Sequence, residues 1–356
     1  QGRFPLLPDH STLLSLPQSY IDEMSALMPL RIGKKNPKVS VLNWMMGGFK
    51  FADKLMTVSP AYAAEIVESA IKGVELEKIA QARGGVEGIL NGVKNVVTPS
   101  SKELVKAGAL ASGYDSKTLE KKLLCKAALQ KKFGLEVDES IPLFCFLGRY
   151  DVQKGIDVLF ESLERDVLPT MSVQVVIMGS GNKALVDKAK ALLKAFPTKF
   201  KAVLAFKGAE KFEVYAGADF AIMTSRYEPC GLVQMESMRF GTVPLATPTG
   251  GLKDTVFDGI SGLLTSHEID PDHETILPDD IEMISELFVR ACKLYKDKDA
   301  MHAMQVAGMM ESRELSWTNA AKLYETVFAQ LCVKDVKPGI PLDERQHERL
   351  VEAAKV

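Results

Sequence analysis

The chain has 356 residues and a mass of 39.0 kDa. This is longer than a chain with a single hydrophobic core usually is, and it fits two domains of about 150 residues each. A formal net charge of −2 excludes the basic excess that general nucleic-acid or membrane-surface binding needs, and no apolar run reaches the ~20 residues that cross a bilayer. The five cysteines form no CxxC pair, so neither a zinc ribbon nor a disulfide framework is indicated. We therefore expect no bound metal, no nucleic-acid or membrane partner, and a reducing compartment.

The first hundred residues show an incomplete alternation of strands and helices. The pattern predicts a helix over 43–51, a strand over 54–58, a helix that Pro60 opens at its favoured first-turn position, and a strand over 86–90. Two or three strands do not complete a doubly wound domain. We predict that residues 1–97 form part of such a domain, followed by a linker of little periodicity.

A fuller alternation follows from about residue 140. The predicted strands are 142–148, 173–178, 203–206, 220–223, 243–246 and 263–264, and the predicted helices are 156–168, 183–196, 281–295, 297–310 and 317–331. Uninterrupted apolar strands separated by helices are typical of a parallel sheet covered on both faces. The sequence therefore predicts an α/β, doubly wound domain over 98–331, with a loose charged tail at 332–356.

Three ligand-type loops follow successive predicted strands. They carry Gly148-Arg149, Gly179-Ser180-Gly181 and Glu228-Pro229-Cys230-Gly231. Because parallel strands end at one edge of a sheet, we expect these loops to share one crevice. The last loop leads into an amphipathic helix, whose free N–H groups suit an anion.

Arg149 and Lys154 flank the first of these loops. A guanidinium fork and an ammonium point charge suit a diphosphate whose leaving group gains negative charge. The alternative is two solvated surface cations. Because both residues come directly after a buried strand, at the end where ligands bind, we favour the binding interpretation.

The second loop carries a weaker signal. Gly179 and Gly181 form a G-x-G without the third glycine of a dinucleotide fingerprint, so NAD binding is not supported. A tight turn and a close approach to a ribose or phosphate remain alternatives. Phe206, at a predicted strand end, could stack on a base, although a core position is the interpretation that the sequence pattern favours.

Glu228 and Glu236 are not expected to act as an acid and base pair. Glu236 lies about five residues along the predicted helix, ~7 Å away in axial rise. We expect Glu228 to contact a sugar, with a helix N-cap as its alternative role. Glu236 is either a ribose contact or an exposed helix glutamate. Cys230 has no histidine nearby, which argues against a Cys-His hydrolase.

The segment Thr249-Gly250-Gly251-Leu252 lacks the Gly-Lys-Ser/Thr ending of a P-loop, so an ATPase is not supported. We expect instead a backbone nest, with Asp254 and Thr255 starting the next helix.

These motifs together resemble the C-terminal signature of starch and glycogen synthases, which are retaining glycosyltransferases with two Rossmann-like domains (the GT-B fold). The resemblance rests on SRYEPCGLVQMESMRFGT, TGGLKDTV, FLGRYDVQKGIDVL, YAGADFAIMTSR, LSWTNAAKLYE, LMTVSPAYAAEI, KGVELEKIA and GILNGV. The segments QGRF, KGVELE and KPGI look most like the granule-bound, amylose-making branch.

The resemblance implies transfer of glucose from ADP-glucose, with UDP-glucose as a second candidate donor, to the 4-OH end of an α-1,4-glucan with retention. It places Arg149 and Lys154 on the diphosphate, Glu228 with the Cys230 and Gly231 backbone on the glucose, and Phe206 against adenine. Thr249, Gly250 and Gly251 would line the donor cleft. No cofactor is implied; the implied partner is the starch granule and the implied location a plastid, either chloroplast or amyloplast.

Two departures from the family pattern matter. The family's Lys-Thr-Gly-Gly-Leu loop and donor-side histidine lie upstream of a step like Gln1-Gly2, so residues 1–97 correspond to the C-terminal part of an acceptor-side domain. The usual Asp and Trp-Asn-Pro near the hinge are replaced by Lys94 and by the run 96–99. We therefore expect this polypeptide alone to be inactive. The alternatives are a non-catalytic nucleotide-sugar- or glucan-binding relative and a GT-B enzyme with another acceptor.

Overall fold

The structure is a computed structural model that describes residues 3–5, 14–29, 38–94, 97–205, 208, 210–271 and 275–332. The chain divides into two compact units, Gln1–Ala320 and Ala321–Val356. The domain boundary predicted at residue 97 stays a prediction.

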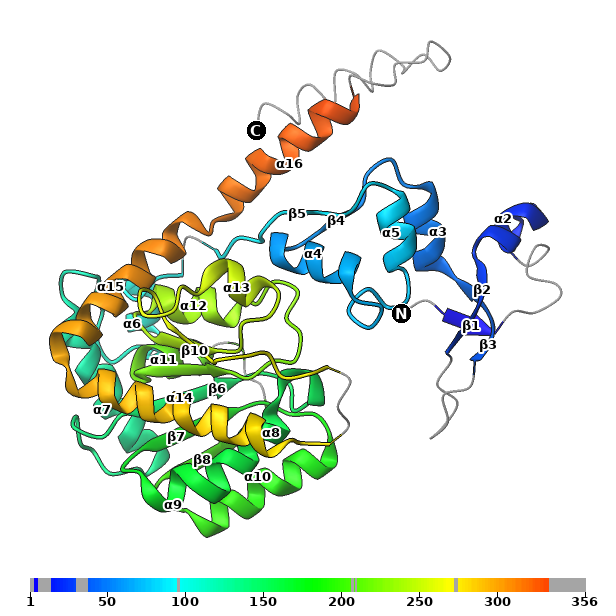
Figure 1. The fold of residues 1–356 in the computed structure, drawn as a ribbon. Helices are drawn as coiled ribbons and strands as arrows, with labels where there is room; N and C mark the ends of the chain where they lie inside the picture. Colours follow the sequence, from blue (N-terminus) through cyan, green and yellow to red (C-terminus); the bar gives the residue numbers. More distant parts are fainter. Residues whose placement is uncertain are drawn as a thin grey trace. The chain divides into compact units, whose positions relative to one another are not determined.

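A six-stranded parallel sheet lies at the centre of the part of the first unit that follows residue 97 (Figure 1). Its order is β11-β10-β9-β6-β7-β8, with β6 at Leu143–Leu147, β7 at Gln174–Met178, β8 at Phe200–Val203, β9 at Phe220–Met223, β10 at Val243–Ala246 and β11 at Leu263–Leu264. Every residue of β6, β7, β9 and β10 is buried. A strand that is buried on both faces carries apolar residues at every position, and for this reason these strands could be predicted from the sequence. The predicted α/β parallel sheet is confirmed.

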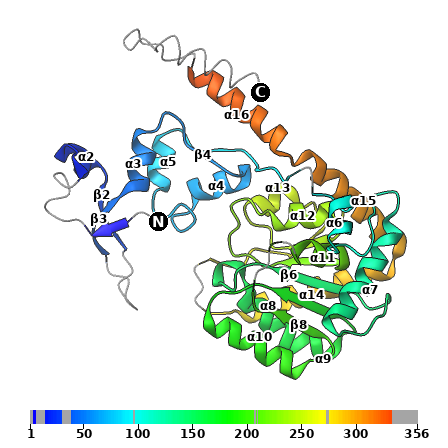
Figure 2. The same ribbon diagram turned by 180° about the vertical axis from the view of Figure 1, so that it is seen from behind.

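Two apolar cores lie on the two faces of this sheet. Along β6, Phe144 and Phe146 belong to one core, while Cys145 and Leu147 belong to the other. Side chains alternate across a strand, so this division shows that helices cover both faces, as the views in Figures 1 and 2 also show.

The helices of this region are short to medium in length. They are α6 Lys102–Lys106, η1 Leu119–Lys121, α7 Lys122–Phe133, η2 Val152–Lys154, α8 Ile156–Ser162, α9 Leu168–Thr170, α10 Lys183–Ala195, α11 Glu210–Gly217, α12 Val233–Arg239, α13 Gly251–Thr255, α14 Pro278–Lys296 and α15 Lys298–Glu314. Their order after β6 follows the predicted alternation.

Two predicted elements differ from the structure. The strand predicted at 203–206 is found earlier, as the edge strand β8 at Phe200–Val203, where a polar residue, Lys201, and three half-buried positions give no continuous apolar run. The helix predicted at 156–168 is interrupted by a π-helical turn, Leu163–Val167, shortly before Pro169, which has no N–H for a helical hydrogen bond.

The N-terminal residues form smaller pieces. The predicted elements appear as α3 Trp44–Phe51, β4 Met56–Thr57, α4 Pro60–Glu68 and β5 Glu87–Gly88, and α2 Gln18–Glu23 and α5 Glu77–Ala82 add to them. The sequence prediction contained no counterpart of the antiparallel sheet β1 (Arg3–Pro5), β3 (Lys38–Asn43) and β2 (Ser25–Pro29). Ser59 caps α4, since its hydroxyl accepts from the N–H of Tyr62 at 3.0 Å.

Helix α16, Trp317–Cys332, crosses the unit boundary, and the rings of Tyr324 and Phe328 lie 6.2 Å apart one turn from each other. The predicted tail at 332–356 lies outside the described residues beyond Cys332. Within the described part of the chain, no helix combines the length and the apolar character that a membrane crossing requires.

Candidate functional site

The loops after β6, β7, β9 and β10 are joined by backbone hydrogen bonds. The N–H of Tyr150 donates to the Ser180 carbonyl at 2.8 Å, and the N–H of Arg226 donates to the Gln153 carbonyl at 2.9 Å. The N–H of Gly251 donates to the carbonyl of Glu228, also at 2.8 Å. The loops that the sequence analysis singled out therefore meet at the carboxyl edge of the sheet.

Lys154 and Glu228 form an ion pair between two of these loops. The ammonium group contacts Glu228 Oε2, and the hydroxyl of Ser225 donates to the same oxygen at 3.0 Å. Asp151 shapes the turn that carries Lys154, because its carboxylate accepts from the N–H of Gln153 at 2.8 Å. The side chains of Lys154 and Glu228 are 22% and 11% exposed, so the pair is partly open to solvent.

Arg149 lies at the rim of the same loops. Its guanidinium donates to Asp151 at 3.2 Å and to Gln153 at 2.8 Å, and 64% of its side chain is exposed. An exposed ion pair of this kind is weak, so a phosphate oxygen can replace Asp151 as its partner. The predicted diphosphate role of Arg149 stays a prediction.

Close packing between loops accounts for the two glycines of the G-x-G segment. A Cβ atom on Gly179 would overlap the carbonyl oxygen of Gly148, and one on Gly181 would overlap that of Tyr150. The structure thus provides a packing reason for both glycines, and a ribose or phosphate contact is not needed to explain them. Phe206 lies outside the described residues.

The Gly250-Gly251 pair is held against the loop of Glu228. Gly250 has a φ of +48°, and a Cβ atom on it would overlap the Glu228 carbonyl oxygen. Helix α13 begins at Gly251, so the prediction that Asp254 and Thr255 start this helix is wrong: they are its last two residues.

Glu236 has its own cationic partner. Its carboxylate accepts from Lys211 Nζ at 2.6 and 2.8 Å and from the hydroxyl of Tyr215 at 3.3 Å. Burial, together with the neighbouring Glu236 carboxylate, raises the pKa of Tyr215, so this hydroxyl stays protonated and donates. Glu228 and Glu236 therefore bind different cations. A ribose contact by Glu236 stays a prediction.

The thiol of Cys230 is buried, and that burial raises its pKa to about 11. A thiol that holds its proton is a poor nucleophile. Gly231 has a φ of +71°, which allows the turn into α12. Within the described ranges, no group of three or more His, Cys, Asp or Glu side chains lies close enough to hold a metal ion.

The sequence analysis missed a buried arginine that supports the Glu228 loop. Arg226 is 2% exposed and binds Asp157 through both terminal nitrogens, at 2.7 and 2.9 Å. It also donates to the Val152 carbonyl at 2.6 Å. This bidentate pair of a guanidinium and a carboxylate holds the loop after β9 against the turn that carries Lys154.

It also missed a cluster that joins α4 to the glycine pair. The N–H of Gly250 donates to Glu65 at 2.8 Å, and Lys72 Nζ lies 3.1 Å from Glu65. Lys72 also contacts Glu268 at 2.7 Å and the hydroxyl of Thr249 at 3.3 Å. A carboxylate from α4 therefore binds the nest that the sequence analysis predicted at Gly250.

Comparison with known proteins relates this arrangement to characterised families. The chain matches the profile described as starch synthase catalytic domain over residues 1–82 and the profile of glycosyl transferases group 1 over residues 129–274. Granule-bound starch synthase 1 of Triticum aestivum is 36% identical over 97% of this chain and 54% of its own length, and that of Ipomoea batatas has the same identity and coverage. The chain thus spans about half the length of the curated relatives it matches.

Solved structures support the same assignment. The catalytic domain of starch synthase IV from Arabidopsis thaliana, bound to ADP and acarbose, superposes with a TM-score of 0.68 and 27% identity, covering 82% of this chain and 58% of that one. Sucrose-phosphate synthase from Thermosynechococcus elongatus, with a TM-score of 0.56 and 19% identity over 82% of this chain and 62% of that one, shares the fold.

The fold and its neighbours are those of glycosyltransferases of the GT-B type. More narrowly, the chain belongs to the starch synthase family, and the resemblance seen in its motifs is confirmed.

Proposed function

We propose that this protein is a starch synthase that transfers glucose from ADP-glucose to the non-reducing end of an α-1,4-glucan with retention of configuration. The observation that carries the proposal is the Lys154–Glu228 pair, which lies with Arg149 on loops at the carboxyl edge of the parallel sheet. The names of the relatives support starch synthesis at the granule of a chloroplast or amyloplast, and amylose as the product belongs to the same proposal.

In the proposed reaction, Arg149 and Lys154 hold the diphosphate and neutralise the charge that it gains on leaving. Glu228, with the Cys230 and Gly231 backbone, binds the hydroxyl groups of the donor glucose. The bond between C1 and the phosphate oxygen breaks, the acceptor 4-OH forms the new bond on the same face, and its proton passes to the leaving phosphate. Positioning and charge stabilisation supply most of the catalysis, so no protein general base or cofactor is required.

The remaining predicted donor contacts belong to the same proposal. Phe206 would stack on adenine, Glu236 would bind the ribose after exchanging Lys211 for it, and the loops of Gly179, Gly181 and Thr249 to Gly251 would shape the cleft. UDP-glucose is the alternative donor.

The test measures incorporation of labelled glucose into amylopectin from ADP-glucose and from UDP-glucose. It compares this chain with a form extended at its N-terminus by the matching segment of a relative, and it measures donor affinity by calorimetry in both. We expect ADP-glucose binding by both forms and transfer by the extended one. Donor binding without transfer in either form would favour a non-catalytic binding protein, and transfer that survives Glu228→Ala would overturn the site.

A further inference from the structure

Gln234 is a fully buried residue of α12 that contacts the loop of Glu228. Its side chain is 0% exposed, and its Nε2 atom donates to the Cys230 carbonyl at 2.9 Å. The same atom donates to the hydroxyl of Thr255, in α13, at 3.1 Å. The sequence analysis assigned no role to this glutamine. It nevertheless binds the Cys230–Gly231 peptide group, which the proposed function places against the donor glucose.

The contact with Cys230 decides the orientation of the next backbone N–H. The structure has no cis peptide bond among the described residues, and in a planar trans peptide the C=O and the N–H point in opposite directions. Because Gln234 holds the Cys230 carbonyl toward α12, the N–H of Gly231 points to the other side of the loop. In the described part of the chain this N–H donates to no group, so it is free to bind a ligand.

Glycine alone does not select this orientation. Gly231 has a φ of +71°, but a glycine adopts positive and negative φ with similar ease, so the peptide group before it could also turn over. The turned peptide would direct the Cys230 carbonyl outward and the N–H inward. Gln234 opposes this rotation, because Cys230 is 4% exposed and a buried carbonyl that loses its partner is unfavourable.

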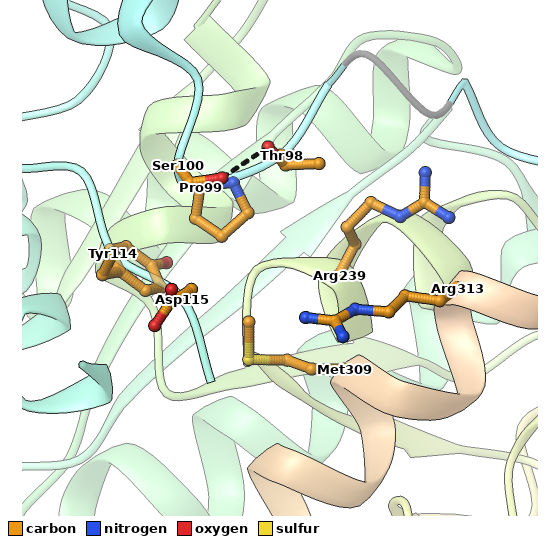
Figure 3. A pocket seen from close by; sticks show the side chains of 8 residues that line it. All are labelled: Thr98, Pro99, Ser100, Tyr114, Asp115, Arg239, Met309 and Arg313. Carbon is orange, nitrogen blue, oxygen red and sulfur yellow. Dashed lines mark hydrogen bonds between the residues drawn. The ribbon is translucent and has the colours of Figure 1, made fainter. Parts of the chain in front are cut away.

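A second buried side chain anchors α12 itself. Arg239, the last residue of the helix, is 6% exposed, and its terminal nitrogens donate to the carbonyls of Lys94, at 2.9 Å, and Ser312. Figure 3 shows that its guanidinium points away from that of Arg313, so these anchoring contacts are its own. With one end of α12 tied to two other segments, Gln234 has a rigid support, as a group that orients a binding site needs.

A tie between α12 and α13 is the alternative explanation for Gln234. The bond to Thr255 would be enough for such a tie, since the Thr255 hydroxyl also donates to the Gly251 carbonyl at 2.7 Å. It does not explain the contact with Cys230, or why Oε1 of Gln234 is buried without a hydrogen-bond partner among the described residues. Both follow if the amide is oriented to place its N–H groups on the two oxygen acceptors.

We propose that Gln234 is a positioning residue for the donor glucose, a role that rests on the proposed function. By holding the Cys230 carbonyl, it aims the N–H of Gly231 at a hydroxyl oxygen of the sugar. Gln234 itself touches neither the sugar nor the bond that breaks. Its effect is therefore confined to ligands that carry the glucose, and ADP alone does not depend on it.

The test measures the affinity of this chain for ADP-glucose and for ADP by calorimetry and compares their ratio between variants. Gln234→Met removes the N–H donors at nearly constant length. Gln130→Met is the matched control: Gln130, in α7, is 1% exposed and donates to the Asp138 carbonyl and to Oε1 of Gln174, both at 2.9 Å. Gln234→Glu is a near-isosteric second variant, whose new carboxyl group can donate to Cys230 only when it is protonated.

We expect the ratio of ADP-glucose affinity to ADP affinity to fall by about fivefold or more in Gln234→Met, while the ADP affinity stays unchanged. Gln130→Met should keep the ratio, although the melting temperature falls in both variants. In Gln234→Glu the ratio should fall as the pH rises, because the new carboxyl group loses its proton and with it the bond to Cys230.

An unchanged ratio in folded Gln234→Met would overturn the positioning role and leave the proposed function standing. If that variant does not fold, a ratio in Gln234→Glu that equals that of the unaltered chain at every pH would do the same. An equal loss of ratio in Gln130→Met would show that any lost buried glutamine disturbs the site, which also contradicts the proposal. If the unaltered chain binds neither ligand, the proposed function fails and this role fails with it.

Discussion

Two charged clusters meet at the loops after β9 and β10, and they differ in access. The Lys154–Glu228 pair joins neighbouring loops, and 22% of the Lys154 side chain is exposed. The cluster of Lys72, Glu65 and Glu268 joins α4 to the glycine pair, and only 8% of the Lys72 side chain is exposed. We therefore expect the Lys154–Glu228 pair to exchange partners with a ligand, and we call it the binding cluster. The second cluster, in which Lys253 also contacts Glu65 and Glu268, is expected to keep its own contacts, and we call it the holding cluster.

The substitution with the largest expected effect tests the holding cluster. Lys72→Met removes the nearer of the two cations of the buried Glu65 carboxylate and leaves Lys253 Nζ at 3.6 Å, so we expect the free energy of unfolding to fall by about 3 kcal/mol. Urea denaturation at pH 7 measures this. Lys54→Met is the control, because the Lys54–Glu87 pair is exposed and is expected to contribute less than about 1 kcal/mol. Equal losses in the two variants would remove the distinction between the clusters.

The binding cluster is tested by Glu228→Ala. We expect glucose transfer in the extended form to fall about 100-fold or more, because a contact that positions the sugar is lost. Stability should fall by about 1 kcal/mol or less, since Lys154 keeps contact with solvent. Transfer assays and urea denaturation measure the two effects, with the surface variant Glu161→Ala as control. A large stability loss at unchanged transfer would make this pair a second holding cluster.

Gly250→Ala tests the backbone that links the two clusters. At a φ of +48°, with the Glu228 carbonyl in the space of the new methyl group, we expect a loss of about 2 kcal/mol together with weaker donor binding. The matched control is Gly48→Ala in α3, where the methyl group meets no atom within 4 Å. That change should stabilise the protein by up to about 1 kcal/mol. Thermal unfolding of both variants compares them.

The smallest effect is a pH dependence at Glu268. Burial alone would raise its pKa, but hydrogen bonds and charge from Lys253 and Lys72 lower it below the ordinary value of 4.5. A carboxylate whose pKa is lower in the folded than in the unfolded protein stabilises the fold. This contribution is complete at a pH above the pKa of the unfolded protein, and it is lost as the pH falls through the pKa of the folded protein. We therefore expect Glu268→Gln to reduce the melting temperature at pH 7 and to approach the unaltered protein below about pH 4. A difference that is constant with pH would exclude this ionic contribution.

The parallel sheet could be predicted because its strands carry the information locally. Residues 220–223 and 243–246 are apolar throughout, and the structure forms β9 and β10 over those residues. The antiparallel sheet was missed although Val39 and Val41 alternate with polar Ser40, a pattern typical of a half-buried strand. Its short partners, Arg3–Pro5 and Ser25–Pro29, have no such pattern, and pairing alone makes them strands.

The sequence by itself determined the family, the α/β class and the loops that carry Arg149, Lys154 and Glu228, because each motif is contiguous and follows a strand. Only the tertiary structure decided which charges meet. The Arg226–Asp157 pair joins residues 69 apart in the chain, and the Lys72–Thr249 contact joins residues 177 apart. No local pattern encodes such contacts, because a charged side chain selects its partner through the packing of elements that are distant in sequence.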